Sequence, residues 1–296
     1  MQIRSLTGCS YTLILLLKCA FFNGFYRCHT DVTYDIIKKN IRERREAAMK
    51  YKKIKEGVFL DRPNRFIANV LIDGKEERVH VKNTGRCREL LLLGTKLWLE
   101  DFTEEESSRK TKYDVIAVEK KTAKGRLLIN MDSQAPNKVA EEALLDGTLK
   151  LPGFASEVSV VKREKTFGKS RFDLYVEGFD EENPEKVKKA FVEVKGCTLE
   201  RNGVAMFPDA PTERGVKHIC ELIEAKKAGY EAVILIVIQM KGVSVFRPND
   251  NTHPEFGEAL REAQKAGVHI LAYDCHVVPG IVELGEPVRI DLVKSI

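Results

Sequence analysis

The chain has 296 residues, of which 43% are hydrophobic and 31% charged, and its net charge is +5. This length suits two ordinary domains, and the composition excludes a disordered or fibrous protein. The first 48 residues hold eight basic and four acidic residues. The rest of the chain is therefore near neutral, and any nucleic-acid-binding surface on it must be a local patch.

The cysteines predict neither a zinc site nor a disulfide framework. None of them forms a C-x-x-C pair. Their positions are Cys9, Cys19, Cys28, Cys87, Cys197, Cys220 and Cys275. Scattered free thiols favour a reducing compartment, so we expect a cytoplasmic protein.

Residues 1–48 allow three interpretations. The apolar run Tyr11–Leu17 is interrupted by Lys18, so it is shorter than the roughly 20 apolar residues of a membrane span. A signal peptide stays open because Arg4 precedes the run, although no clear cleavage site follows. We favour a true start at Met49, with residues 1–48 as a mis-assigned or disordered leader, because the composition changes there. We expect no membrane partner.

Residues 49–134 are predicted to form a small β-barrel of the oligonucleotide-binding (OB) kind. The pair Asp73-Gly74 is a hairpin signal, and further strands are predicted around residues 97–99, 109–118 and 126–130. About five short strands with polar turns are typical of a small barrel or sandwich. Apolar residues alternate with others at Phe66, Ala68, Val70, Ile72, Val79 and Val81.

Residues 135–296 are predicted to form an α/β domain, with the boundary near residue 134. A short helix capped at Asn137 and ending near Gly147 opens it, and two strand-rich stretches follow. Thr212 is expected to cap a helix over residues 212–228, with Cys220 on its apolar, core-facing side.

Apolar strands and helices then alternate to the end of this second domain. The apolar run at residues 232–238 is predicted to be a fully buried strand. A helix over 254–267 and a strand over 268–274 come after it. Helices that alternate with buried strands predict an α/β architecture, so the whole chain is expected to be of mixed α+β class.

Two short segments on consecutive predicted strands carry the candidate chemistry. One contains Asp173, and the other contains Glu193 and Lys195. Along the second strand, Val192 and Val194 share one face, while Glu193 and Lys195 share the other. A carboxylate and an ammonium on one face of a buried sheet are costly without partners, so this face requires an explanation.

Two explanations remain open from the residues alone. A salt bridge on an edge strand is the commoner meaning of so short a pattern. Alternatively, Asp173 and Glu193 bind Mg²⁺ or Mn²⁺, and Lys195 orients or deprotonates the water that attacks a phosphodiester. The apolar flanking strands favour the second explanation, as do Arg214 and Lys217 on the following helix.

Other candidates have equally plausible structural roles. Glu142 is a further metal-ligand candidate, but it also fits a solvated helix position. His218 could shuttle protons, although a lone helical histidine is more often structural. The sequence lacks Walker, G-x-G-x-x-G, G-x-S-x-G and H-E-x-x-H motifs. P-loop nucleotide hydrolysis, dinucleotide redox chemistry and zinc peptidase chemistry therefore lack their signatures.

The chain closely resembles the sugar fermentation stimulation protein family of bacteria and archaea. The resemblance extends from about residue 57 to 285, and the family's usual beginning aligns near Met49. One departure is Pro211, where the family more often has valine. The matching stretches are RFIANV, HVKNTGRC, KSRFDLYV, FVEVKGCTL, FPDAPTERGVKHICEL and GVHILAYD.

The resemblance implies an OB-like barrel followed by a restriction-endonuclease-like domain of the D…(D/E)xK type. Asp173, Glu193 and Lys195 match the catalytic motif of the family. Residues 83–86 match its N-T-G segment, whose residues also suit a plain turn. The residues predicted to contact nucleic acid are Arg65, Asn83, Thr84, Arg86, Arg171, Arg214, Lys217 and His218.

Two functions follow from these expectations. The first is a Mg²⁺- or Mn²⁺-dependent nuclease acting on DNA or RNA. The second is a non-catalytic DNA-binding regulator of sugar (maltose) metabolism, which the resemblance also implies. The intact set of Asp173, Glu193 and Lys195 favours the nuclease, because carboxylates repel a polyanion. An exposed barrel edge could support a homodimer.

Overall fold

Two β-sheets organise the part of the chain that the computed structural model describes, which is residues 49–83, 85–105, 108–123 and 125–294. The expectations for residues 1–48 and for Thr84 lie outside these described residues. Both sheets belong to one compact unit, Ala47–Ile296. No helix in the described part of the chain is long and apolar enough to cross a membrane.

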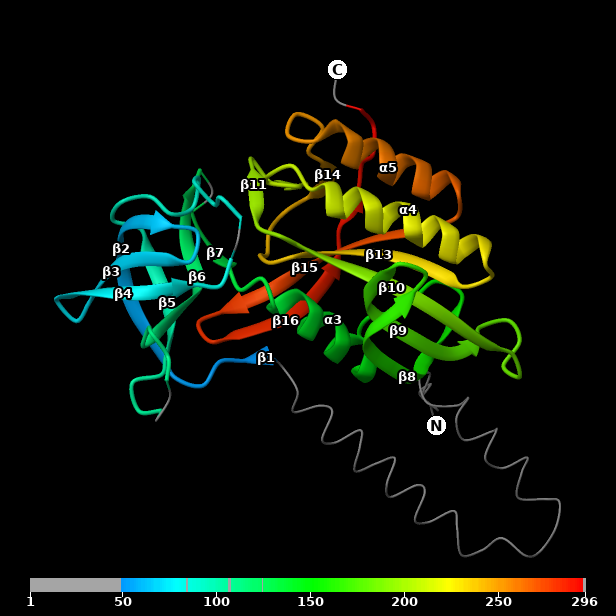
Figure 1. The fold of residues 1–296 in the computed structure, drawn as a ribbon, viewed down its shortest axis with the longest axis horizontal. Helices are drawn as coiled ribbons and strands as arrows, with labels where there is room; N and C mark the ends of the chain where they lie inside the picture. Colours follow the sequence, from blue (N-terminus) through cyan, green and yellow to red (C-terminus); the bar gives the residue numbers. More distant parts are fainter. Residues whose placement is uncertain (1–48, 84, 106–107, 124, 295–296) are drawn as a thin grey trace, which may run out of the picture. The chain divides into compact units, whose positions relative to one another are not determined.

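The first sheet is a closed barrel (Figure 1). Its strands are β2 (Ile54–Asn64), β3 (Ile67–Ile72), β4 (Lys75–Val81), β5 (Lys96–Asp101), β6 (Tyr113–Thr122) and β7 (Gly125–Asn130). They pair in the order β4-β3-β2-β5-β6-β7, and a parallel pairing of β4 with β6 closes five of them. A five-stranded barrel of this kind is the predicted OB architecture, which is confirmed.

The start of β3 differs from the predicted alternation. Ala68 and Val70 are fully buried in the barrel, but Phe66 is 52% exposed. Phe66 lies in the turn before β3, where the side-chain oxygen of Asn64 accepts the backbone N–H groups of Phe66 and Ile67 at 2.9 and 3.1 Å. This local turn ends the alternation, so Phe66 does not share the buried face of Ala68 and Val70 that its place in the predicted alternation implied.

The second sheet is mixed and has seven strands in the order β1-β16-β15-β13-β10-β9-β8. These are β1 (Met49–Lys50), β8 (Phe154–Phe167), β9 (Ser170–Asp180), β10 (Val187–Cys197), β13 (Glu231–Ile238), β15 (His269–Val278) and β16 (Ile281–Pro287). The central strands β10, β13 and β15 are parallel, and β13 is the predicted buried strand. Met49 and Lys50 belong to this sheet, although the sequence placed them with the barrel.

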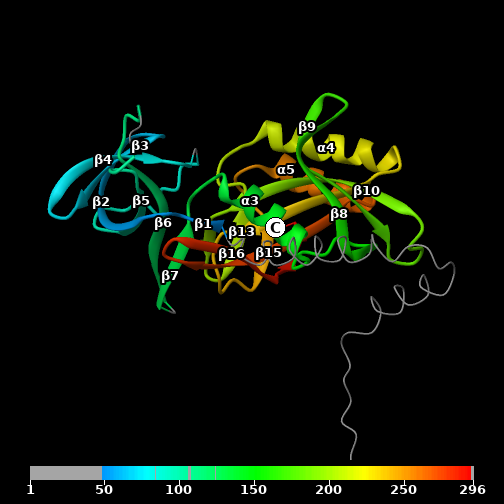
Figure 2. The ribbon, with the colours of Figure 1, turned by 90° about the horizontal axis from the view of Figure 1, so that it is seen from below.

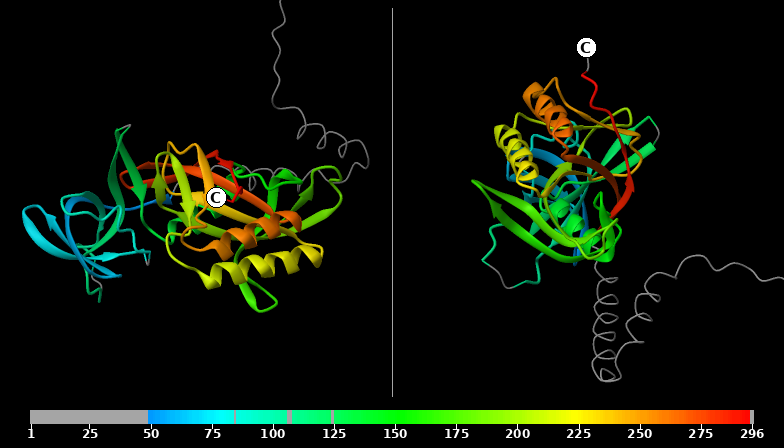
Figure 3. Two further views of the ribbon diagram at one scale, coloured as in Figure 1. Left: turned by 90° about the horizontal axis from the view of Figure 1, so that it is seen from above. Right: turned by 90° about the vertical axis from the view of Figure 1, so that its right-hand side faces the viewer.

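Helices cover both faces of the second sheet. α4 (Glu213–Lys227) and α5 (Pro254–Lys265) pack side by side on one face (Figure 3). α3 (Ala135–Asp146) packs on the other face against β8, β10 and β16 (Figure 2). A smaller four-stranded sheet extends from the end of β10. Its strands are β11 (Leu199–Arg201), β12 (Val204–Phe207), β14 (Val245–Pro248) and β17 (Arg289–Ile290).

The helix boundaries correct two predictions. Thr212 caps α4 as expected, because its hydroxyl accepts the backbone N–H of Gly215 at 3.0 Å. α3 begins earlier than predicted, after Gln134, because Pro136 fits the first helical turn. Cys220 is exposed, because the buried face of α4 consists of Gly215, His218, Ile219, Leu222 and Ala225.

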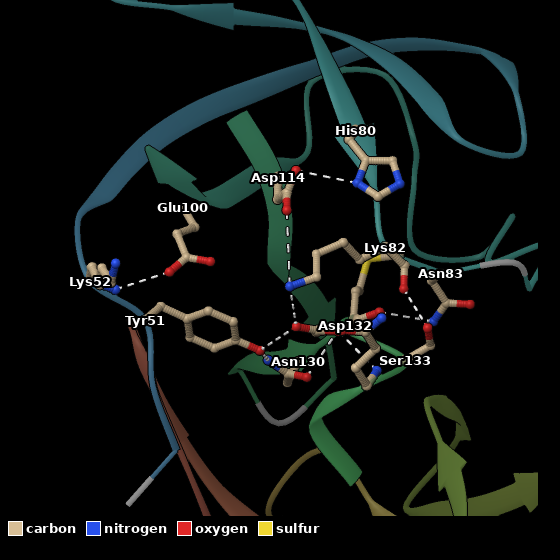
Figure 4. A network of polar contacts seen from close by, with 12 residues as sticks. Tyr51, Lys52, His80, Lys82, Asn83, Glu100, Asp114, Asn130, Asp132 and Ser133 are labelled. Atoms are coloured by element: carbon tan, nitrogen blue, oxygen red, sulfur yellow. Dashed lines mark hydrogen bonds and ion pairs between the residues drawn. The ribbon is translucent and has the colours of Figure 1, made fainter. Parts of the chain in front are cut away.

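A buried polar network joins the barrel to the chain that enters and leaves it (Figure 4). Its centre is Asp132, whose carboxylate is 2.8 Å from the Lys82 ammonium and accepts the Tyr51 hydroxyl at 3.2 Å. Asn130 donates to the Tyr51 oxygen at 3.0 Å. Gln239, at the end of β13, donates to Asn130 at 2.8 Å and so ties the network to the second sheet. Burial, and then the Asp132 carboxylate, raise the pKa of Tyr51, which keeps this phenol a neutral donor.

Asp132→Ala is expected to destabilise the fold by about 3–5 kcal/mol, because it leaves the Lys82 ammonium without its closest partner in a largely buried position. Tyr51→Phe removes one hydrogen bond from the same network and should cost only about 1 kcal/mol. Urea unfolding followed by circular dichroism measures both values. A loss for Asp132→Ala no larger than that for Tyr51→Phe would contradict the role given to this ion pair.

Candidate active site

The register between β9 and β10 brings Asp173 and Glu193 together. Antiparallel pairing runs as far as Leu174 opposite Val192 and stops there, so Asp173 and Glu193 occupy the next opposed positions. Where the ladder ends, the Asp173 carboxylate accepts the backbone N–H of Val194 at 2.8 Å. A side chain thus replaces the backbone partner that continued pairing would have supplied.

Asn137 of α3 holds the second oxygen of Asp173. The Asn137 side-chain N–H donates to it at 2.8 Å from the α3 side of the sheet. The sequence interpretation made Asn137 a helix cap, and nothing local pointed to this contact 36 residues away. Asn137 is therefore a site residue that the sequence missed, and it becomes available because α3 begins before it.

Glu193 faces α4, on the side of β10 opposite Val192 and Val194. Its side chain is buried, and one oxygen accepts the Lys195 ammonium at 2.5 Å and contacts Nδ1 of His218. The other oxygen, Oε2, is buried and has no hydrogen-bond partner among the described residues. The predicted alternation along this strand holds, since Val192 and Val194 pack in the core on the other face.

His218 is engaged on both ring nitrogens. Nε2 lies 3.4 Å from Nε of Arg214, which can only donate. Nε2 must then accept, and a neutral ring carries its proton on Nδ1, where it donates to Glu193. This assignment follows from the donor chemistry of the neighbours. His218 thereby fixes the side chain of Glu193, with Arg214 behind it.

The two carboxyl groups are shifted in opposite directions. Burial, and then the neighbouring Glu193 charge, raise the pKa of Asp173 despite its two hydrogen bonds. Burial also acts to raise the pKa of Glu193, but the His218 hydrogen bond and the Lys195 ammonium outweigh it and hold that pKa below its ordinary value. Paired titratable groups with divergent pKa values are typical of functional sites.

Glu142 is not part of this group. Its carboxylate lies 3.8 Å from the Lys138 ammonium and accepts a hydrogen bond from the Met49 backbone. Among the described residues, Glu142 forms no hydrogen bond or ion pair with Asp173 or Glu193, so the structure does not bring the predicted third ligand to this pair. Within the described ranges, no three histidine, cysteine, aspartate or glutamate side chains are grouped to hold a metal ion. An ion here would have two protein carboxylates and solvent or substrate oxygens.

The remaining predicted residues lie on three surfaces. Arg171 is exposed on β9 and lies 3.4 Å from Glu164. Lys217 is exposed on α4 and lies 3.9 Å from Glu221. Arg65 and Arg86 are exposed on barrel loops, where Asn83 is half-buried.

The N-T-G loop of the barrel is held from within the barrel. The guanidinium of Arg62 donates to four backbone carbonyls, those of Arg65, Asn83, Gly85 and Arg86, at 2.6 to 3.0 Å. One arginine thus replaces a regular strand pairing for the whole loop. No sequence signal marked Arg62 for this role.

The same loop docks on the segment that leads into α4. Asp209 accepts the backbone N–H of Arg86 at 3.2 Å. A Cβ on Gly85 would lie 2.5 Å from the Asp209 carboxylate, so only glycine permits this approach. Asn83 accepts the N–H of Gly85 at 2.7 Å and donates to Met131 at 3.0 Å. The contacts of Asn83 and Gly85 therefore require these residue types at their positions, which a plain turn would not.

Comparison with known proteins gives a consistent result over both sheets. Residues 60–129 match the model described as the SfsA N-terminal OB domain, and residues 134–280 match the sugar fermentation stimulation protein RE domain. A sugar fermentation stimulation protein homolog from Desulfitobacterium hafniense is 54% identical over 247 residues, which is 83% of this chain and 100% of the relative. A homolog from Alkaliphilus oremlandii is 53% identical over 243 residues, covering 82% and 99%.

A solved structure is also similar. It is described as Pyrococcus furiosus SfsA in complex with Ca²⁺, and it has a TM-score of 0.69 and 28% sequence identity. The match covers 83% of this chain and 99% of that one.

In metal-free buffer, Asp173 is expected to titrate above the ordinary range of an aspartate and Glu193 below that of a glutamate. Asn137→Ala removes a donor that favours the charged form of Asp173, so it should raise the pKa of Asp173 further. Carbon-13 NMR of the side-chain carboxyls in EDTA measures both, with assignment by Asp173→Asn. A pKa of Asp173 that stays put or falls in Asn137→Ala would contradict this geometry.

Proposed function

The chain belongs to the sugar fermentation stimulation protein family, and from this premise we propose that it is a metal-dependent nuclease that hydrolyses phosphodiester bonds in DNA or RNA. The observation that carries the proposal is the buried Oε2 of Glu193, which has no partner within the described part of the chain and belongs to a side chain whose charge raises the pKa of Asp173. A buried carboxylate oxygen without a donor is costly, and a cation would satisfy it.

The residues present fit Mg²⁺ or Mn²⁺. Mg²⁺ in proteins commonly takes one or two carboxylates and completes its shell with water and substrate phosphate. Asp173 and Glu193 supply two carboxylates that repel each other when no cation lies between them. The Pyrococcus furiosus protein described in complex with Ca²⁺ supports a divalent-ion site in this fold. A divalent ion there supplies Lewis acidity toward the scissile phosphate and the attacking water.

The side chains around the carboxylates then have distinct tasks. Asn137 and the Val194 N–H orient Asp173. His218 and Lys195 bind one oxygen of Glu193 and leave the other directed away from protein donors. The Lys195 ammonium, 16% exposed, adds positive charge where negative charge develops on the phosphate.

The OB domain suggests a nucleic-acid partner under either function. A non-catalytic DNA-binding regulator of sugar metabolism would need the barrel but not the carboxylate pair. Two carboxylates beside a bound polyanion weaken binding unless a cation offsets their charge. The pair therefore favours the nuclease over the regulator.

Lys195→Ala and Asp173→Ala are each expected to lower cleavage of labelled single- and double-stranded DNA and RNA by about 100-fold or more, because Lys195→Ala removes positive charge beside the phosphate and Asp173→Ala removes a carboxylate that would hold the cation. Cleavage should need Mg²⁺ or Mn²⁺ and stop in EDTA. Lys294→Ala, which alters an exposed lysine paired with Glu258, is the matched control and should cut normally. Cleavage that persists in both site variants points to a contaminant, and tight binding without any cleavage favours the regulator.

Mg²⁺ or Ca²⁺ should also stabilise the fold. An ion that binds only the native state raises the free energy of unfolding by about 2.7 kcal/mol when its concentration is 100 times its Kd. Thermal unfolding should show a Tm several degrees higher with the ion. Glu193→Gln keeps the shape of the side chain and should abolish this rise. Glu142→Gln is the matched control and should keep it, since Glu142 lies with Lys138 and Met49. An unchanged ion response in Glu193→Gln would rule out this pair as the binding site.

A further inference from the structure

A pocket of about 610 Å³ lies where the barrel meets the carboxyl ends of β10 and β13. Gly196 and Thr198, at the end of the strand that carries Glu193 and Lys195, form part of its lining. Gln239 lines it from the end of β13. The carboxyl ends of parallel strands are where open α/β sheets bind ligands. The volume is within the range of small-molecule sites and suits one nucleotide.

Hydrogen bonds hold the described residues of both pocket walls. The barrel side is the loop that Arg62 holds through four carbonyls, which presents Asn83 and Gly85 to the pocket. The other side is the segment before α4, which docks on that loop through Asp209. A preformed wall loses little conformational entropy when a ligand binds.

The rim carries two arginine side chains that form no ion pair with any residue that the structure describes. The side chains of Arg65 and Arg86 line the pocket, are exposed, and have no partner in the described ranges. Thr212, the N-cap of α4, lines the same pocket, so the positive end of that helix adds to the field there. Unpaired arginines and a helix N-terminus together favour phosphate.

The interior of the pocket suits a base rather than a second phosphate. Ser133 and Gln239 offer acceptor oxygens, because the Ser133 hydroxyl donates to the Lys82 carbonyl at 2.6 Å and the Gln239 amide donates to Asn130 and Asp132 at 2.8 and 3.0 Å. The Asp209 carboxylate would repel a phosphate. Phe66, which follows Arg65 in the same turn, lies outside the pocket lining and is 52% exposed, so it offers an aromatic surface for a neighbouring base rather than for the base in the pocket.

The pocket also lies next to the carboxylate pair along one strand. A strand rises about 3.3 Å per residue, so Thr198 is roughly 10 Å from Lys195. A nucleic-acid strand with one nucleotide in the pocket can therefore have a neighbouring phosphate at Asp173 and Glu193. Bases of an intact duplex are stacked and paired and cannot enter this pocket without being extruded.

We propose that this pocket binds one nucleotide of single-stranded nucleic acid, with Arg65 and Arg86 on its phosphates and its base against Ser133 and Gln239. The proposal rests on the nuclease function for its biological meaning and names the substrate form, a single strand that extends from the barrel to the carboxylates. The recognition chemistry is common to DNA and RNA.

The test measures binding of fluorescein-labelled eight-residue oligoadenylates, one of DNA and one of RNA, to the full-length protein by anisotropy in EDTA. Ala210→Trp fills the pocket, and it should weaken binding of the preferred strand at least about tenfold. Arg65→Ala with Arg86→Ala should weaken it similarly and lower the slope of log K against log salt by about 1.4, as expected for two lost phosphate contacts on a single strand.

Arg78→Ala is the matched control. It removes an exposed barrel arginine that does not line the pocket, and binding should change less than twofold. Equal losses in Arg78→Ala and the rim variant, or normal binding by a correctly folded Ala210→Trp, would overturn the pocket. Stronger binding of a blunt duplex than of either single strand would also overturn it.

Hydrolysis of bis(p-nitrophenyl) phosphate separates this proposal from the nuclease function. This small diester needs the carboxylates but not the pocket, so Ala210→Trp should hydrolyse it normally with Mg²⁺ or Mn²⁺ and Lys195→Ala should not. If the wild type binds single strands through the pocket but hydrolyses neither nucleic acid nor the small diester, the nuclease function is contradicted and the pocket proposal is supported. If the diester is hydrolysed and pocket variants bind strands normally, the pocket fails and the nuclease function stands.

Discussion

The packing of a buried carboxylate, Glu193, beside a half-buried one, Asp173, is the constraint on which the second sheet depends. Asp173 and Glu193 are each costly to bury without partners, so donors must reach them from outside their own strands. α3 supplies Asn137 from one face of the sheet, and α4 supplies His218 from the other. The end of the β9–β10 ladder frees the backbone N–H of Val194 for the same purpose. The positions of both helices therefore serve the carboxylates as well as the apolar core. One oxygen stays without a donor, which is a cost that apolar packing elsewhere must offset.

The attachment of the barrel follows a similar logic. Asn130 and Gln239 exchange hydrogen bonds across the junction, and Asp132 holds Lys82 just before the chain enters α3. Buried polar groups that lose their partners are left desolvated, so such a junction permits few alternative arrangements. An apolar junction could slide by small steps without a comparable loss. A barrel fixed in this way keeps its loop at a constant distance from the end of β10, and that constancy is what a pocket shared by both parts requires.

The sequence predicted what depends on local pattern. The alternation of Val192 and Val194 with Glu193 and Lys195 placed the polar pair on one face, and the apolar run of β13 marked the centre of the sheet. The missed features depend on contacts between distant residues, such as Asn137 with Asp173 and Arg62 with the N-T-G loop. The expected positions of Cys220 and Phe66 differ from the structure for local reasons. The buried face of α4 is rotated away from Cys220, and the turn at Asn64 exposes Phe66. Hydropathy alone does not resolve either feature.

The N-T-G loop and the segment before α4 are more than 120 residues apart in sequence, and contacts between them account for the residue types in both segments. Gly85 has no side chain because the Asp209 carboxylate occupies that space, and Asp209 is directed there by the N–H of Arg86. The side chain of Asn83 donates to the Met131 carbonyl and accepts the N–H of Gly85. Among these groups, the side chain of Arg86 alone forms no hydrogen bond or ion pair with a described residue. Asn83, Gly85 and the backbone of Arg86 are engaged within the protein, so the exposed Arg86 guanidinium stays available to a partner outside this chain, near the end of the strand that carries Glu193.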